Sequence, residues 1–345
     1  MRCVEATSAL GSHAPDSAKL EAVRYLGQRF ASARLRDVAI VRAEELDRSA
    51  DPTGSTRVWL ALETLQVTGS FKVRGALVAL DAHRTARRVV AASGGNHGVG
   101  VAYAANVLGM CAVVCVPRST SPIKRAKIDR YGANMVVVRS DRPEDVEAQA
   151  LRIAEEQDAA FISSYDDIDV VLGNGSSLGF EIVRALGGLP DRILAPVGSG
   201  GLATGLSWAL EAEAQSPVER KVWGAQSERS CAVARWLERP SDDAKAPRHG
   251  SLVKALAGGR MASALARAES TLAGIVVLPE DEIRRTVRGA YRDMGLVLEA
   301  SAAVALGPVR TGLPPSLCGG DLLVVLSGRN VDPADFESTL ESKDN

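Results

Sequence analysis

The chain has 345 residues, of which 46% are apolar, and its formal net charge is −1. This length allows one large domain or two medium domains with a substantial buried core. The near-zero charge gives no support for binding to nucleic acid or to an anionic membrane surface, and the lack of a long apolar run argues against a membrane-spanning helix.

The N-terminus and the cysteines bear on the location of the protein. Residues 1–18 have no apolar segment behind a basic start, so we expect a disordered lead and no secretory signal. The five cysteines form no C-x-x-C pair, and Cys111 and Cys115 share one predicted strand, about 13 Å apart and too far for a disulfide. This usage is typical of a reducing cytoplasm, and the four histidines lack metal-ligand spacing.

The first half of the chain alternates strands with helices. Between residues 88 and 163, four strands alternate with three helices, which predicts a compact parallel unit with right-handed crossovers. We interpret 88–163 as a small domain inserted into a large domain made of 1–87 and 164–345. The elements expected here are helices at 19–30, 99–108 and 123–131, a helix from 143 with Asp141 as its N-cap, and strands at 57–62, 88–92, 111–116, 135–138 and 159–163.

The second half continues this alternation. Gly-rich breaks follow strands at 93–98, 198–201 and 327–330, and ligands of open parallel sheets bind outside the carboxyl ends of strands. Residues 240–251 are polar and charged, which predicts a mobile loop. The expected helices are 169–185, 202–212, 231–238, 280–294 and 299–306, and the expected strands are 191–197, 222–225, 275–278 and 322–326.

Lys72 is the first candidate for chemistry. It stands between Phe71 and Val73 where a loop runs into a helix, within the segment T-G-S-F-K-V-R-G-A at 68–76. Apolar neighbours desolvate an ammonium and lower its pKa, which makes the amine available as a nucleophile and suits a Schiff-base lysine. The alternative is a surface lysine whose stem covers apolar neighbours.

The Gly-rich turn at 198–201, G-S-G-G, lies between a predicted strand and a predicted helix. Glycines let the backbone approach an anion closely, and the free N–H groups of the following helix favour a phosphate. The turn matches neither a Walker loop nor a dinucleotide fingerprint. A tight strand-to-helix turn without a ligand is the alternative.

A second turn, S-G-G-N-H-G at 93–98, also precedes a helix. Its free N–H groups could hold a carboxylate, and Asn96 could hydrogen-bond a substituent on a ring. Alternatively the segment is a capped turn in which asparagine tolerates a left-handed conformation, and His97 is a packed histidine.

Together these segments resemble the fold-type II pyridoxal-phosphate enzymes, most closely the threonine/serine dehydratase and serine racemase branch. The matching segments occur in the family's order between Glu63 and Asp332: TGSFKVRGA, AASGGNHGVGVAYAA, SPIKRAKIDRYGA, PVGSGGLATG, LVLEASAAVAL and VVLSGRNVD. The resemblance implies an α/β fold like that of the tryptophan synthase β chain, with two open, twisted, mostly parallel sheets and helices on both faces. It also implies pyridoxal 5'-phosphate as the cofactor.

The resemblance also implies residue roles. Lys72 looks like the Schiff-base lysine and the proton shuttle at Cα, Phe71 and Asn96 like the groups that flank and orient the pyridine ring, and Ser327 like the neutral partner of the ring nitrogen. Glu299 matches an acid near the family's active site, although it could instead be a carboxylate that stabilises a helix N-terminus. The substrate-carboxylate loop would contain Ser93, Gly94, Gly95, Asn96 and His97, and the phosphate cradle Gly198, Ser199, Gly200, Gly201 and Leu202.

Three departures from the family pattern refine this expectation. Racemases of the family carry a serine hydroxyl where this chain has Gly94, which favours elimination over racemisation. Gln226 and Ala232 stand where metal-binding members have carboxylates, so no divalent cation is expected. The segment Ser163-Ser164-Tyr165 is atypical, and Tyr165 is expected to shape the substrate pocket.

The expected activity is β-elimination from a 3-hydroxy amino acid such as L-threonine or L-serine, which yields a 2-oxo acid and ammonia. The alternative is β-replacement, in which an aminoacrylate is trapped by a nucleophile to give a β-substituted amino acid. A binding protein with a decayed site is a further alternative, against which the intact lysine, asparagine and glycine segments argue. The expected partner is an amino-acid substrate, and relatives are commonly homodimers.

Overall fold

A computed structural model gives the structure of the chain and describes residues 1–6, 15–214, 219–240, 250–256 and 262–341. Its larger sheet has seven strands in the order β1-β10-β9-β8-β11-β3-β2, and all neighbours pair in parallel except the edge strands β1 and β2. The strands are β1 (Arg2–Glu5), β2 (Ile40–Arg42), β3 (Thr56–Leu62), β8 (Arg192–Pro196), β9 (Val222–Ser227), β10 (Gly274–Leu278) and β11 (Gly320–Leu326).

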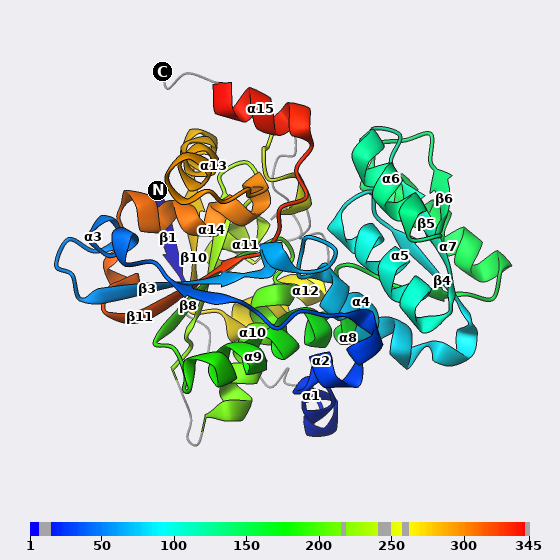
Figure 1. Cartoon of the computed structure of the whole chain (residues 1–345), viewed down its shortest axis with the longest axis horizontal. Coiled ribbons are helices and arrows are strands. Elements are labelled where there is room, and N and C mark those ends of the chain that lie inside the picture. Colours follow the sequence, from blue (N-terminus) through cyan, green and yellow to red (C-terminus); the bar gives the residue numbers. More distant parts are fainter. Residues whose placement is uncertain (7–14, 215–218, 241–249, 257–261, 342–345) are drawn as a thin grey trace.

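The second sheet has four parallel strands in the order β6-β5-β4-β7. Its elements lie together on the right of Figure 1. The four alternating strands and three helices predicted from the sequence are confirmed, while the division into domains at residues 88 and 163 stays a prediction. The elements are β4 (Arg88–Ala92), α5 (Asn96–Leu108), β5 (Cys111–Val116), α6 (Pro122–Arg130), β6 (Asn134–Val137), α7 (Pro143–Glu156) and β7 (Ala160–Phe161).

The remaining helices include those that cover both faces of the seven-stranded sheet, and none in the described part of the chain is long and apolar enough to cross a membrane. They are α1 (Ser17–Val23), α2 (Leu26–Arg29), α3 (Asp47–Ala50), α4 (Lys72–Ala82), α8 (Ile168–Val171), α9 (Ser177–Leu186), α10 (Gly201–Glu213), α11 (Ala232–Glu238), α12 (Ala262–Thr271), α13 (Glu280–Met294), α14 (Ala300–Thr311) and α15 (Pro333–Glu341). Single turns are η1 (Ala31–Ala33), η2 (Glu44–Leu46), η3 (Glu63–Leu65), η4 (Arg84–Ala86), η5 (Leu172–Ser176), η6 (Lys254–Leu256) and η7 (Pro315–Leu317).

Strand β11 shows why the sheet must be covered on both faces. Leu322, Val324 and Leu326 pack in one cluster with residues of α13 and α14. Leu323 and Val325 point the other way, into a cluster with residues of α9, α10 and α11. Alternate side chains of a strand face opposite sides of the sheet, so a continuous apolar run needs helices on both faces. The predicted α/β fold class is confirmed.

A π-helical turn packs against the starts of two helices that matter for the site. The single helix predicted at 169–185 is instead α8, the π-helical η5 and α9. Turn η5 contacts α4 and α10. A Cβ on Gly173 would lie 2.6 Å from the Arg74 carbonyl oxygen, and one on Gly175 only 2.3 Å from that of Leu202. The glycines therefore let the first turns of α4 and α10 approach η5 closely.

Several local expectations were wrong. The N-terminal lead is not disordered throughout, because Arg2–Glu5 pairs antiparallel with β10 as strand β1. The helix expected over 19–30 is interrupted at Tyr25 between α1 and α2. Helix α7 has Arg142 as its N-cap, while the Asp141 carboxylate accepts a hydrogen bond from the Ser119 backbone N–H at 2.7 Å. Most of the loop predicted as mobile, residues 241–249, lies outside the described residues.

Candidate active site

Lys72 is the first residue of α4, and the chain around it is bound to the segment that follows β11. The Phe71 N–H donates to the Ser327 carbonyl oxygen at 3.2 Å, and the Arg329 N–H donates to the Gly69 carbonyl oxygen at 2.9 Å. These bonds hold the predicted Schiff-base lysine beside Ser327, the predicted partner of the ring nitrogen.

The Lys72 amine is desolvated, as the sequence predicted. The side chain is partly buried, and burial lowers the pKa of Lys72 from 10.5 to about 8. Its Nζ lies 5.3 Å from the centroid of the Phe71 ring. An amine with this pKa is neutral in a large fraction of molecules near pH 8, so it can act as a nucleophile or accept a proton.

A buried ion-pair cluster anchors α4 two residues after Lys72. The Arg74 guanidinium donates two hydrogen bonds to Glu63, at 2.8 and 2.9 Å, and two to Glu181, at 2.7 and 2.8 Å. The three side chains are at most 3% exposed. Bidentate pairs of this kind fix geometry strongly, so the cluster orients the start of α4. The cluster has no recognisable sequence pattern, because Glu63 and Glu181 lie far apart in the chain.

The loop at 93–97 lies beside Lys72 because α5 packs against α4. A Cβ on Gly100 would lie 3.0 Å from the Lys72 carbonyl oxygen, so the two helices touch within four residues of Asn96. Ser93 Oγ accepts from the Gly95 N–H at 3.1 Å and shapes the turn. Helix α5 begins at Asn96, earlier than predicted, and its first N–H groups have no acceptor within the helix. They can bind an anion.

His97 is buried and neutral. Burial, and secondarily the Lys72 ammonium, lowers the pKa of His97 to about 3. Its Nε2–H donates to the Ile162 carbonyl oxygen at 3.1 Å, which leaves Nδ1 as an acceptor. Within the described part of the chain, three side-chain polar atoms are buried without a hydrogen-bond partner: His97 Nδ1, Ser70 Oγ and Ser121 Oγ.

Glu299 reaches the same place from the other sheet. It is the N-cap residue of α14, but its side chain makes no capping bond. Instead Glu299 Oε1 accepts a hydrogen bond from Asn96 Nδ2 at 2.7 Å. Burial raises the pKa of Glu299 to about 7, against the opposing effects of Asn96, Lys124 and Lys127.

The predicted phosphate turn follows β8 and leads into α10. Gly200, the N-cap, has φ +102°, a left-handed conformation that suits glycine. A Cβ at this position would lie 2.6 Å from the Ala268 Cβ. The buried Gln226 side-chain amide fixes the backbone just before the turn, because its Nε2 donates to the Val197 carbonyl oxygen at 3.1 Å. The first N–H groups of α10 have no acceptor within the helix, so they can bind an anion at this turn.

The structure therefore brings some of the predicted site residues into direct contact and leaves others without a direct contact. Asn96 and Glu299 are in direct contact, and Lys72 lies beside the Ser327 segment. No hydrogen bond joins the 198–202 turn to Lys72 among the residues that the structure describes, but the helices that begin at both points pack on η5. Tyr165 lies in the segment before α8, and its neighbour Asp166 is tied to α12 through Ser263 Oγ at 3.1 Å.

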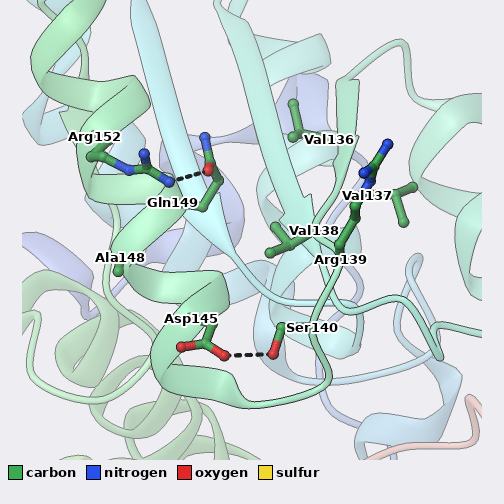
Figure 2. A pocket seen from close by; sticks show the side chains of 9 residues that line it. All are labelled: Val136, Val137, Val138, Arg139, Ser140, Asp145, Ala148, Gln149 and Arg152. Carbon is green, nitrogen blue, oxygen red and sulfur yellow. Dashed lines mark hydrogen bonds between the residues drawn. The ribbon is translucent and has the colours of Figure 1, made fainter.

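A surface pocket of about 560 Å³ lies elsewhere, beside β6 and α7 (Figure 2). In it Ser140 Oγ donates to the Asp145 carboxylate at 2.6 Å. None of its residues is a predicted coenzyme or substrate contact, so we do not assign the reaction to it. The lining residues are Val136, Val137, Val138, Arg139, Ser140, Asp145, Ala148, Gln149 and Arg152.

The donor set fits pyridoxal phosphate. The desolvated Lys72 amine suits an aldehyde, and the free N–H groups at the start of α10 suit a phosphate. The unpartnered Ser70 hydroxyl and His97 Nδ1 lie close to Lys72 in the chain or in space and can bind a further polar ligand.

Comparison with known proteins agrees with this fit. The sequence profile of a family described as "Pyridoxal-phosphate dependent enzyme" matches residues 36–328. The chain is 32% identical over 293 residues to a putative threonine dehydratase of Sinorhizobium fredii, covering 83% of this chain and 85% of the relative. It is 32% identical over 294 residues to phenylserine dehydratase of Ralstonia pickettii, covering 83% and 86%.

Comparison with a solved structure also points to a threonine deaminase-like fold. The crystal structure of a threonine deaminase from T.th. superimposes with a TM-score of 0.78 at 30% identity, over 92% of this chain and 99% of that chain. The profile spans most of the chain, including the segments that contain Lys72, the 93–98 loop, the 198–202 turn and Ser327. The chain therefore belongs to the family of pyridoxal-phosphate dependent enzymes, with pyridoxal phosphate as its cofactor.

Proposed function

We propose that the chain is an ammonia-lyase that eliminates the β-hydroxyl group from a 3-hydroxy amino acid such as L-threonine or L-serine. The products are a 2-oxo acid and ammonia. The observation that carries the proposal is the desolvated Lys72 amine, with its pKa of about 8, in a site whose loop has Gly94 in place of a side-chain proton donor. The threonine and phenylserine dehydratases among the relatives support the same reaction class.

Residues in segments that follow strands of both sheets, together with the start of α4, would hold the coenzyme. Lys72 would bind its aldehyde, the N–H groups of the turn at 198–202 its phosphate, and the Asn96 amide a substituent on its ring. The Ser327 hydroxyl would face the ring nitrogen, and Phe71 would flank the ring. Bound pyridoxal phosphate withdraws electrons from Cα of the amino acid and so makes the Cα proton acidic.

The chain's own groups then move and hold the proton. Lys72 accepts it as a free amine, because burial keeps the pKa of this amine near 8 and leaves it partly neutral at neutral to mildly basic pH. The proton taken from Cα and the departing β-hydroxyl together make one water. The unsaturated amino acid that remains reacts with another water after release, which gives the 2-oxo acid and ammonia. The N–H groups at the start of α5 would hold the substrate carboxylate.

Gly94 directs the proposal toward elimination. Racemisation needs a second proton donor or acceptor on the opposite face of Cα, and glycine has no side chain to provide it. A Cβ at this position would lie 2.2 Å from Thr120 Oγ1 and 3.1 Å from the Pro117 ring. Packing therefore leaves no space for a hydroxyl-bearing residue unless Thr120 moves.

The test is to incubate the purified holoenzyme with L-serine, L-threonine and L-phenylserine and to assay 2-oxo acid and ammonia, with Lys72→Ala as the control. We expect turnover of at least one substrate by the natural chain and none by the variant. Absence of 2-oxo acid with a range of 3-hydroxy amino acids would contradict the lyase. Formation of D-serine would indicate a racemase, and a β-substituted product with added thiols or amines would indicate β-replacement.

Two finer expectations belong to this proposal. We propose a cytoplasmic enzyme, from the odd number of free cysteines, and a homodimer, from the family resemblance. Light scattering of the purified holoenzyme measures the oligomeric state, and a monomer at micromolar concentration would contradict the second expectation. We also expect full activity after treatment with a chelator, because Gln226 and Ala232 replace the carboxylates of metal-binding relatives.

A further inference from the structure

Four polar side chains form one hydrogen-bonded chain between the two sheets, which we call the amide relay: Lys127, Asn330, Asn96 and Glu299. Lys127 Nζ donates to Asn330 Oδ1 at 2.6 Å, and Asn330 Nδ2 donates to Asn96 Oδ1 at 2.8 Å. Asn96 Nδ2 then donates to Glu299 Oε1 at 2.7 Å. Lys127 and Asn96 come from α6 and α5 beside the small sheet, whereas Asn330 follows β11 and Glu299 precedes α14.

The relay has one direction, because its ends determine how both amides point. A lysine ammonium can only donate, so the atom of Asn330 that faces Lys127 must be the amide oxygen. The Asn330 NH₂ group then faces Asn96 Oδ1, and it also donates to the Thr68 carbonyl oxygen at 2.9 Å, which can only accept. Asn96 must consequently turn its own NH₂ group toward Glu299.

The surroundings leave the two amides little freedom. Asn330 is 5% exposed and Asn96 is 8% exposed. Gly69, with φ +79°, lies so close that a Cβ there would be 2.5 Å from Asn330 Oδ1. A flipped Asn330 amide would point its NH₂ group at the Lys127 ammonium and its oxygen at two acceptors. Buried polar groups without partners are costly, so the observed orientation is strongly preferred.

We propose that Lys127 and Asn330 are positioning residues of the active site, which hold the Asn96 amide with its NH₂ group toward Glu299. They act through Asn96 and contact neither substrate nor coenzyme. The meaning of the relay for catalysis rests on the proposed function, in which the Asn96 amide binds a substituent on the coenzyme ring. Because Lys127 lies on α6, beside the small sheet, and Asn330 follows β11 of the larger sheet, the relay also joins the two halves of the site.

Lys124 provides a matched control for the charge of Lys127. It lies on the same helix, α6, and its charge also lowers the pKa of Glu299. Lys124 makes no hydrogen bond or ion pair with any residue that the structure describes. Lys124→Met and Lys127→Met thus each remove one positive charge near Glu299, but only the second removes the first donor of the relay.

The experiment measures the affinity of the coenzyme-free protein for pyridoxal phosphate by absorption titration, and kcat/KM for the best substrate. We expect Lys127→Met and Asn330→Ala each to weaken coenzyme binding about tenfold, because the Asn96 amide is then no longer held in place, an effect of about the size of one hydrogen bond. The double variant should bind no more weakly than Asn330→Ala alone, because the relay is already broken. Lys124→Met should stay within about twofold of the natural chain, and Lys127→Arg should recover most of the loss because a guanidinium also donates.

Two results would overturn the relay: equal effects of Lys127→Met and Lys124→Met, or losses that multiply in the double variant. If Asn330→Ala fails to fold, the comparison of the two lysine variants decides. Coenzyme affinity is measured without turnover. If the natural chain forms no 2-oxo acid, the proposed function is wrong, but the titrations still test the relay. Turnover combined with multiplying losses would defeat the relay alone.

Discussion

The lowered pKa of Lys72 affects both the reactivity of its amine and the stability of the folded protein. Its amine has a pKa of about 8 in the folded protein, against 10.5 for an ordinary lysine, because burial disfavours the ammonium. Below pH 8 the folded protein must therefore hold a poorly solvated charge, which costs stability. Between the two pKa values the unfolded chain binds more protons than the folded one, so the free energy of unfolding rises with pH across this window.

Replacement of Lys72 by methionine removes this cost. We expect the coenzyme-free Lys72→Met variant to be more stable than the natural chain by about 2 kcal/mol at pH 7, a value reduced for the partial exposure of the side chain. The gain should shrink as the pH rises from 8 toward 10.5. Urea unfolding at several pH values measures it. A variant that is less stable at pH 7 would mean that the ammonium has a stabilising partner.

Gly94 has little space for a side chain, whereas its neighbour Gly95 has room for one. A Cβ on Gly94 would lie 2.2 Å from Thr120 Oγ1, whereas a Cβ on Gly95 would find nothing closer than Ser93 Oγ at 3.8 Å. We expect Gly94→Ser to lower the free energy of unfolding by about 1–3 kcal/mol, as overpacking does, and Gly95→Ala to change it little. Thr120→Gly should restore part of the loss in the Gly94→Ser background. Equal stabilities of the two glycine variants would show that Thr120 moves aside freely.

At the scale of elements, regular structure was predictable wherever the apolar pattern is strong. Strands β4, β5 and β11 contain continuous apolar runs, and such runs indicate a sheet covered on both faces. Strand β1 escaped prediction because only its pairing with β10 orders a short, mostly exposed segment. The N-cap of α7 was misplaced because the Asp141 carboxylate binds the Ser119 N–H, a partner 22 residues away.

The π-helical turn η5 was also unpredictable, because its form depends on packing against α4 and α10. Its glycines give an element-level prediction: a Cβ on Gly173 would lie 2.6 Å from the Arg74 carbonyl oxygen, whereas Gly188 has nothing within 4 Å. Gly173→Ala should push the start of α4 away and weaken coenzyme binding roughly tenfold, by a displacement of the kind that misplaces a reacting group. Gly188→Ala, the control, should bind normally. Equal affinities in an absorption titration would contradict the role of η5.

The Arg74 cluster anchors α4 more strongly than any surface pair can. Arg74→Met would leave the Glu63 and Glu181 carboxylates buried without their cation, and breaking a buried pair in this way costs about 3–5 kcal/mol. Arg84 offers the comparison, because its side chain is 60% exposed in its pair with Asp81, and such surface pairs contribute below about 1 kcal/mol. Denaturant unfolding of Arg74→Met and Arg84→Met measures the difference. A similar small loss in both would mean that the carboxylates take up protons or water easily.

For the whole molecule, the site is made of segments that lie far apart in the sequence. The individual motifs were recognisable because each is a local pattern: a lysine among apolar residues, or a glycine turn between a strand and a helix. The bonds among Lys127, Asn330, Asn96 and Glu299 follow no such pattern, since they depend on how the two sheets are placed. The sequence therefore predicted the parts of the site, while their connection required the structure.

A site shared between the sheets should respond to its coenzyme as one unit. We expect pyridoxal phosphate to slow amide hydrogen exchange in two places: residues 93–101, at the start of α5, and residues 198–206, at the start of α10. The free N–H groups at both helix starts would then face the bound ligand and exchange more slowly with water. Helix α7, which lines the separate pocket of Figure 2, is the internal control and should not change. Protection at only one helix start would mean that the coenzyme contacts one sheet alone. Protection of α7 instead would move the site to the pocket beside β6.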